Sequence, residues 1–160
     1  MIFDPSIFAT LVQQYGYFGA FLAGFLSSFT LFIPSPTFIG IFFIGGVMNP
    51  VLVGICAALG STLGESISYL FGFGISKAAK KKYKKMINKI EKWFLKYRPS
   101  VVIFIFAATP LPFDVVGIVA GIVNYDKKKF LIATLAGKLV KFTLIAVAGY
   151  YFLPYLTDFF

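Results

Sequence analysis

The chain has 160 residues, of which 59% are hydrophobic and only 13% are charged, and its mean hydropathy is +0.86. Soluble domains typically carry about 25% charged residues, so the composition excludes an ordinary soluble domain and indicates one compact, all-α integral membrane domain. The sequence contains no histidine, and its one cysteine is Cys56. We therefore expect no metal site, no cofactor and no disulfide within the chain.

The first part of the chain combines a polar start with an apolar run that proline interrupts. Residues 1–14 are predicted to form a short interfacial helix, because apolar residues recur there at helical spacing. The apolar run that follows meets the Pro34–Pro36 break and then continues only through residues 37–47. The Asn49–Pro50 pair is a turn signal.

A first spanning helix is predicted over residues 51–74, because a bilayer core takes about 20 residues of helix. Glycines at positions 60 and 64 permit a close contact with another helix. The polar residues of this segment share one face at steps of three and four, and they are Ser61, Glu65, Ser68 and Tyr69.

The net charge of +9 is a local feature, because residues 77–98 hold ten of the fifteen basic residues. Apolar residues recur there every three to four positions between the lysines. This pattern predicts an amphipathic helix that lies on the cytoplasmic membrane surface or folds over the cytoplasmic mouth of the protein. A solvated connector without a ligand is the alternative. The absence of a recognition motif argues against a nucleic-acid partner.

A second apolar run, residues 101–123, is interrupted by the segment from Thr109 through Pro110 to Pro112. A proline in a helix interior costs about 3 kcal/mol, so this run is not one plain helix. After a turn and the Lys127–Lys129 cluster, a second spanning helix is predicted from Phe130 to Leu153.

The positive charges indicate how the interrupted run meets the membrane. If residues 101–123 crossed it, the basic clusters at 77–98 and 127–129 would lie on opposite sides, against the preference of lysine for the cytoplasm. A hairpin that enters, turns at Pro110–Pro112 and returns keeps both clusters cytoplasmic. Each arm of about ten residues then reaches half-way across. We therefore predict a re-entrant hairpin in a multi-pass protein of the cell membrane.

The two proline breaks indicate an internal repeat. Shifting the numbering by 76 places Pro34–Pro36 on Pro110–Pro112, and the order of break, short arm, turn and long span recurs. We divide the chain into repeat 1, residues 15–74, and repeat 2, residues 100–153. One full span separates the breaks, so the two units enter from opposite faces. This is an inverted-topology repeat, an arrangement that places sites at the midplane between broken helices.

Ionisable residues inside the apolar segments mark the predicted site. The same shift aligns Glu65 with Lys141, and Lys138 lies one turn away on a face shared with Thr134. A structural ion pair and a functional site are both compatible with these positions. Two lysines and one glutamate leave a net positive charge inside the membrane, and an anionic group such as a phosphate would balance it. Asp114 follows the second break, where it would cap the returning helix or take part in proton coupling or substrate contact.

Several stretches of the sequence combine into the pattern of a known family. They are Phe32–Pro36 with Gly45-Gly46, Gly60–Glu65 with Tyr69 and Gly72, and Ala108–Pro112 with Ala120-Gly121, Phe130 and Gly137-Lys138. From Gln13 to Gly149 the chain resembles the DedA family, also called the VTT or SNARE-associated Golgi protein domain, and especially its short archaeal and YqaA-like branch. The resemblance implies two opposed re-entrant hairpins. It also implies movement of lipids across bilayers, polyprenyl-phosphate carriers in bacteria and phospholipids in eukaryotes.

Two positions depart from the larger bacterial members. Those members usually carry an acid just after the first Pro-x-Pro, where this chain has Thr37-Phe38. They carry an arginine three residues past the second break, where this chain has Phe113 followed by Asp114. Lys138 and Lys141 would supply the missing positive charge.

We predict a membrane lipid translocase or scramblase that moves a polyprenyl phosphate or a phospholipid between leaflets. Its substrate site would hold Glu65, Asp114, Lys138 and Lys141 between the two hairpins. One alternative is a proton- or cation-coupled exporter of small solutes, and another is a non-transporting assembly factor that binds a partner through residues 77–98. We do not expect an enzyme, because the sequence shows no nucleophile–base pair and no phosphate-binding loop. Formation of a homo-oligomer is left open.

Overall fold

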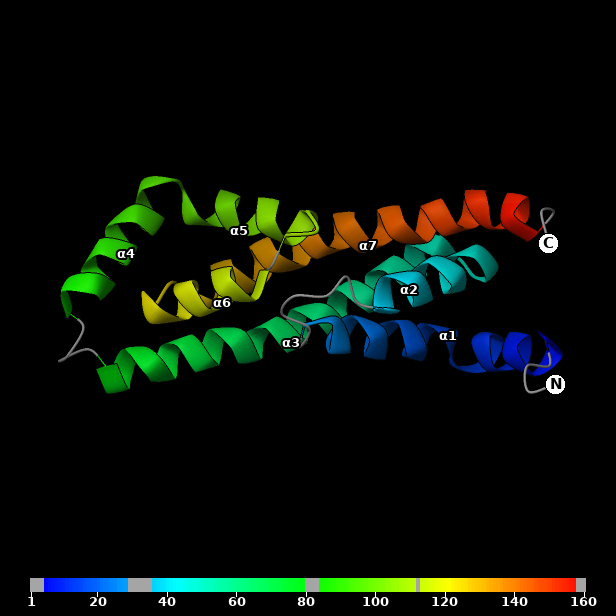
Figure 1. Ribbon diagram of the computed structural model, residues 1–160, viewed down its shortest axis with the longest axis horizontal. Helices are drawn as coiled ribbons and strands as arrows, with labels where there is room; N and C mark the ends of the chain where they lie inside the picture. The colour runs from blue at the N-terminus through cyan, green and yellow to red at the C-terminus, as the bar shows by residue number, and fades with distance from the viewer. Residues whose placement is uncertain (1–4, 29–35, 80–83, 112, 158–160) are drawn as a thin grey trace.

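In a computed structural model, the chain folds into helices that lie along one long axis (Figure 1). The structure describes residues 5–28, 36–79, 84–111 and 113–157, and every regular element within these ranges is helical. The helices are α1 (Pro5–Ser27), α2 (Pro36–Val47), α3 (Pro50–Ala79), α4 (Lys84–Lys96), α5 (Pro99–Ala108), α6 (Phe113–Ile122) and α7 (Lys127–Thr157). The all-helical fold class predicted from the sequence is confirmed for the described residues.

The two long helices, α3 and α7, form the centre of the molecule and run antiparallel. Gly54 near the start of α3 lies against Thr143 in the second half of α7, whereas Glu65 lies against Lys138. The segments Pro50–Ser76 and Lys127–Tyr155 are long and apolar enough to cross a membrane. They correspond to the two spanning helices that the sequence predicts.

Side-chain caps begin both long helices at the turns that the sequence signals. Asn49 Oδ1 accepts a hydrogen bond from the backbone N–H of Val51 at 3.0 Å. Asp126 Oδ1 accepts one from the backbone N–H of Lys129 at 2.8 Å. A carboxylate or amide oxygen in this position satisfies a backbone donor that the first helical turn leaves unpaired.

The shorter helices turn back near the middle of the molecule (Figure 1). Helix α1 comes from the end that holds both chain termini, and α2 returns toward that end. Helix α5 comes from the opposite end, where α4 lies, and α6 returns toward it. Thr109, which follows α5, is extended (φ −101°, ψ 165°), because a residue that precedes proline is disfavoured in the helical region.

The prolines of the two predicted breaks are described only in part. Pro36 is the first residue of α2, where a missing backbone donor costs nothing. Pro110 lies exposed between α5 and α6. Pro34 and Pro112 lie outside the described residues.

Each returning helix packs on the long helix from the other half of the chain, α2 on α7 and α6 on α3. Glycines bring the backbones together in both contacts. A Cβ on Gly149 would overlap the carbonyl oxygen of Phe42, and a Cβ on Gly72 would overlap that of Ile118. Phe42 and Ile118 are separated by the same 76 positions as the proline breaks. The two halves of the chain are therefore interlocked through corresponding surfaces.

Helix α1 differs from the prediction for the N-terminal segment. The sequence suggested a separate short helix over residues 1–14, whereas the structure continues one helix from Pro5 to Ser27. No proline lies between Pro5 and Pro34, and the glycines in between lower helix stability without breaking the chain of hydrogen bonds.

The predicted basic helix over residues 77–98 is also divided differently. Its first residues continue α3 to Ala79, α4 covers Lys84–Lys96, and residues 80–83 lie outside the described part. Phe94 anchors α4 to the rest of the protein, since its buried ring packs edge-on against Tyr125 with centroids 5.8 Å apart. The neighbouring Trp93 is 59% exposed. Helix α4 therefore covers one end of the molecule with one face and presents the other face outward.

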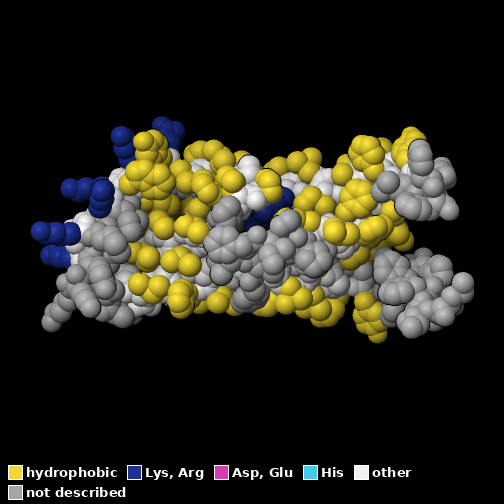
Figure 2. Space-filling model, viewed as in Figure 1, with side chains coloured by type: hydrophobic (Ala, Val, Ile, Leu, Met, Phe, Trp, Pro, Cys, Tyr) yellow, Lys and Arg dark blue, Asp and Glu magenta, His cyan; other side chains and the backbone are white. Residues whose placement is uncertain are grey.

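Hydrophobic side chains dominate the outer surface along the length of the molecule, whereas basic side chains gather at the α4 end (Figure 2). The exposed apolar residues come from nearly every helix and include Phe18, Ile39, Phe71, Ile132 and Leu144. A soluble monomer rarely exposes apolar surface on this scale. The contact of Phe94 with Tyr125 places both basic segments, α4 and Lys127–Lys129, at the same end.

Candidate functional site

Two apolar cores are separated by a layer of buried polar side chains at mid-length. The core nearer α4 includes Ile103, Phe113, Val116 and Phe130. The core nearer the termini includes Ala20, Ile41, Val53 and Phe142. The layer between them contains Ser61, Thr62, Glu65, Asp114, Thr134, Lys138 and Lys141. All four ionisable residues predicted from the sequence therefore lie in one layer.

Glu65 and Lys138 form the centre of this layer. Lys138 Nζ donates a hydrogen bond to Glu65 Oε1 at 2.9 Å, and the side chains of Lys138 and Glu65 are 4% and 2% exposed, respectively. The Lys138 ammonium also lies 5.0 Å from the ring centroid of Phe113. The alignment of the two halves suggested Lys141 as the counterpart of Glu65, but the ion pair uses the lysine one turn earlier. Removing one partner of a buried ion pair strongly destabilises the folded protein, because the other charge is left unpaired. The pair therefore makes the contact between α3 and α7 dependent on both residues.

Lys141 has a different environment, and within the described residues no carboxylate lies within ion-pair distance of it. Its Nζ donates a hydrogen bond to the backbone carbonyl of Thr109 at 3.2 Å. The ammonium lies 5.4 Å from the ring centroid of Phe38 and 5.6 Å from that of Phe142. Because α5 ends next to Thr109, this carbonyl belongs to the negative end of a helix, which favours a cation. Glu65 therefore pairs with Lys138, whereas Lys141 has the Thr109 carbonyl as its acceptor.

Asp114 enters the layer from the start of α6. It is the second residue of that helix, so it does not occupy the capping position before the helix. Its Oδ1 accepts a hydrogen bond from the hydroxyl of Ser68 on α3 at 3.2 Å. With Asp114 included, the layer holds two carboxylates and two lysines, so its formal net charge is zero. Of these four side chains, only Glu65 and Lys138 form an ion pair. The charges are balanced in number but not paired in space.

Two buried polar atoms of the layer have no hydrogen-bond partner among the described residues, Glu65 Oε2 and Thr134 Oγ1. Such groups are rare in native proteins, and each calls for an explanation such as a strained or functional site. Both belong to side chains that are essentially fully buried. The layer can therefore accept and donate further hydrogen bonds.

Sequence reasoning missed two aromatic members of the site. Phe38 and Phe113 face Lys141 and Lys138, respectively, and each lies within the first turns of a returning helix. Both residues come directly after a proline break, and this position could have indicated them. In a re-entrant hairpin the returning helix begins near the middle of the molecule, where the charged side chains lie. A cation over an aromatic face gains about 0.5–2 kcal/mol, depending on its exposure to solvent.

The fold and the layer define a class of protein: helical membrane proteins with broken helices and buried charges at mid-length. The chain belongs to the VTT domain family, because the sequence profile of that domain matches residues 32–151. This confirms the family resemblance seen in the sequence. Proteins of this family are membrane proteins that are commonly linked to membrane transport.

The chain is also similar to an uncharacterized protein of Methanocaldococcus jannaschii. The two are 28% identical over 144 residues, which cover 84% of each chain. No solved structure matches the chain significantly.

Proposed function

We propose that the protein moves a lipid phosphate, either a polyprenyl phosphate or a phospholipid, between the leaflets of the cell membrane. The observation that carries this proposal is the buried Lys141 ammonium, whose hydrogen-bond acceptor is the neutral carbonyl of Thr109. A phosphate oxygen carries negative charge, so it attracts the ammonium by a Coulomb interaction between opposite charges in addition to the hydrogen bond, which a neutral carbonyl does not offer. A phosphate oxygen would therefore compete successfully with the Thr109 carbonyl for this lysine.

The proposed topology has α3 and α7 crossing the membrane and two re-entrant hairpins, α1–α2 and α5–α6, that enter from opposite faces. Both hairpins turn near mid-length (Figure 1). Helix α2 packs on α7 and α6 packs on α3, so each returning helix contacts the long helix of the other half, which supports this arrangement. The two halves then form an inverted repeat, with the polar layer near the midplane. The shared location of α4 and Lys127–Lys129 supports a cytoplasmic position for that end.

The helix ends at the layer would add to the attraction of an anion. Helix α6 begins at Phe113, so its unpaired backbone N–H groups lie at the level of the charged side chains. The start of a helix favours negative charge. Asp114 carries one negative charge there already, and its hydrogen bond to Ser68 directs the carboxylate toward α3.

Access to the layer would be lateral, from the lipid phase. Figure 2 shows a basic patch at mid-length between hydrophobic side chains, apart from the basic end. Lys141 is 8% exposed and Lys138 is 3% exposed. A head group would reach Lys141 first, while its hydrocarbon tail stays against the apolar exterior. No covalent bond is made or broken in this process, so the protein would not be an enzyme.

The test is movement of a fluorescent lipid phosphate across liposomes that contain the purified protein. We expect Lys141→Ala to lower the initial rate at least tenfold, because the bound phosphate loses its cation. Lys128→Ala is the matched control, since that exposed lysine lies on the same helix outside the layer. Equal rates for wild type and Lys141→Ala in folded protein would overturn the assignment of the site.

A proton- or cation-coupled exporter is the second candidate, and the two buried carboxylates favour it. Among the described residues Glu65 Oε2 has no hydrogen-bond partner, and Asp114 accepts a hydrogen bond from the Ser68 hydroxyl. Uptake of a small solute driven by a proton gradient, in vesicles that show no lipid movement, would support this candidate instead. The exposed face of α4 suggests a partner-binding assembly factor as a third candidate. Loss of cellular function on deletion of α4, with Lys141 dispensable, would favour it.

A further inference from the structure

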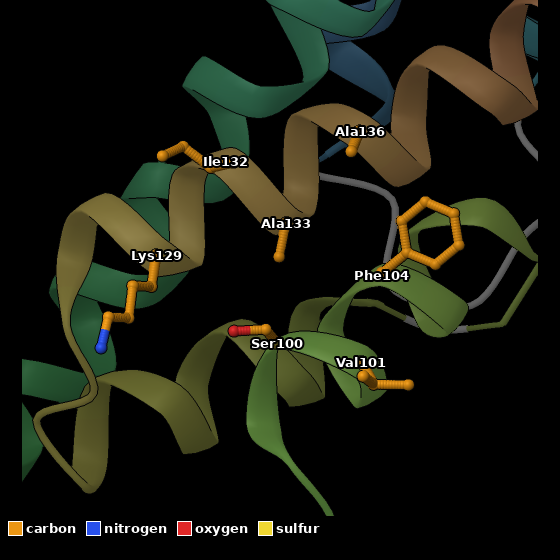
Figure 3. Close-up of a pocket in the computed structure, with 7 residues that line it drawn as sticks. All are labelled: Ser100, Val101, Phe104, Lys129, Ile132, Ala133 and Ala136. Atoms are coloured by element: carbon orange, nitrogen blue, oxygen red, sulfur yellow. The ribbon is translucent and has the colours of Figure 1, made fainter.

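A cavity of about 360 Å³ lies between α5 and α7, at the basic end of the molecule and apart from the polar layer (Figure 3). Its apolar wall consists of Val101 and Phe104 from α5 and Ile132 and Ala136 from α7. Ligand pockets in proteins typically measure about 300–1,000 Å³, so the space is large enough for part of a bound molecule.

Small side chains on α7 create this space. The two helices touch closely at Gly137, where a Cβ would lie 2.5 Å from the carbonyl oxygen of Phe104. Toward the basic end, α7 presents Ala136 and Ala133 to α5, and these side chains fill little of the gap. The outer rim is open, because Ile132 is 69% exposed and Val101 is 48% exposed. The cavity is therefore a groove that opens sideways onto the apolar surface.

The polar groups of the groove lie at one end only. Lys129 and Phe104 occupy opposite ends of the lined space, and the hydroxyl of Ser100 lies on the Lys129 side (Figure 3). Ser100 Oγ is also 2.7 Å from the hydroxyl of Tyr125, which holds it in place at the helix start. The lysines of α4 lie at the same end of the molecule (Figure 2).

We infer that this groove binds one anionic phospholipid from the leaflet at the basic end. The Lys129 ammonium and the Ser100 hydroxyl would hold its phosphate, and one acyl chain would lie along the apolar wall toward Phe104. Basic pockets between membrane helices on the cytoplasmic side bind anionic head groups in this manner. A water-soluble anion would leave most of the groove unfilled, because the lining beyond Lys129 and Ser100 is apolar and the rim opens onto the exposed apolar side chains of Val101 and Ile132. The site is separate from Lys141, so it does not depend on the proposed transport activity.

Native mass spectrometry of the full chain in detergent tests the inference, with phosphatidylglycerol and phosphatidylcholine of identical acyl chains as probes. We expect the anionic lipid to bind at least fivefold more tightly, which corresponds to about one lysine contact at a membrane surface. Lys129→Gln would remove this preference. Lys128→Gln, the adjacent exposed lysine that does not line the groove, would keep it.

A second pair of variants tests the acyl-chain part of the groove. Ala136→Phe would fill it and lower the affinity for both lipids. Ala148→Phe is the matched control on the same helix, because residues one turn away on either side, Leu144 and Phe152, are exposed. Equal affinity for the two lipids in wild type, or unchanged lipid binding by Ala136→Phe, would overturn the inference. A dimer that dissociates in Ala136→Phe would also overturn it, since a second copy of the chain would then be the occupant.

Discussion

Glu65 of α3 and Lys138 of α7 form a buried ion pair, with Oε1 and Nζ 2.9 Å apart, between the two apolar cores of the molecule. Lys141, one turn further along α7, is directed instead at the carbonyl where α5 ends. Two lysines on one helix face thus have different partners: Lys138 connects the long helices, and Lys141 lies next to a proline break. This difference separates a structural role for Lys138 from the substrate-binding role that we propose for Lys141, and the two can be measured independently.

Removing the carboxylate of the ion pair should destabilise the fold. Glu65→Gln leaves the Lys138 ammonium without its partner in a region of low dielectric constant, and breaking a buried pair in this way costs about 3–5 kcal/mol. The measurement is the free energy of unfolding in mixed detergent micelles. Glu91→Gln on α4 is the control and should unfold like wild type. An unchanged stability of Glu65→Gln would show that the ion pair does not hold α3 against α7.

The two lysines should differ in their contribution to stability. Lys138→Met leaves Glu65 as an unpaired buried charge, whereas Lys141→Met frees only a backbone carbonyl and two aromatic faces. We therefore expect Lys138→Met to lower the free energy of unfolding more than Lys141→Met does. The double variant Glu65→Gln/Lys138→Met should recover part of the loss, because the buried charges are removed together. The opposite order of stabilities would contradict the assigned partners.

The contact between α3 and α6 should be sensitive to a single added methyl group. A Cβ on Gly121 would overlap the backbone carbonyl of Tyr69, so Gly121→Ala should cost about 1–3 kcal/mol through overpacking. Gly74 lies on the same long helix as Tyr69, and a Cβ there meets no atom within 4 Å. Gly74→Ala should be neutral or stabilising by up to about 1 kcal/mol, because alanine favours the helix. Equal effects of the two substitutions would mean that these helices are not in close contact.

The orientation of the molecule can be read from cysteine labelling in intact cells. With Cys56 replaced by alanine, we expect Lys96→Cys and Lys128→Cys to react with a membrane-impermeant maleimide only after permeabilisation. Tyr155→Cys should react in intact cells, because it lies about 40 Å further along α7 than Lys128 and is exposed. Labelling of Lys96→Cys and Lys128→Cys from different sides would rule out the proposed re-entrant hairpin between them.

Much of the fold could be predicted from the sequence alone. High hydropathy and clustered lysines indicate the membrane class, because burial in lipid favours long apolar helices whose charges stay at the ends. The turn signal at Asn49–Pro50 and the turn before Lys127 lie where the structure begins α3 and α7. Helical spacing placed Ser61, Glu65 and Tyr69 on one buried face. These are local properties, which depend on backbone hydrogen bonding and on the 3.6-residue period of the helix.

What the tertiary structure decided is which charges meet. Lys138 and Lys141 share one face of α7, so periodicity could not tell which of them reaches Glu65. The choice depends on the axial offset between antiparallel α3 and α7, which the close contact of Gly54 with Thr143 helps to set. The partner of Lys141 is the Thr109 carbonyl, a group that every residue carries and no sequence pattern reveals. The contact of Ser68 with Asp114 and the positions of Phe38 and Phe113 beside the lysines likewise follow from how the helices pack, because these contacts join residues that are far apart in the chain.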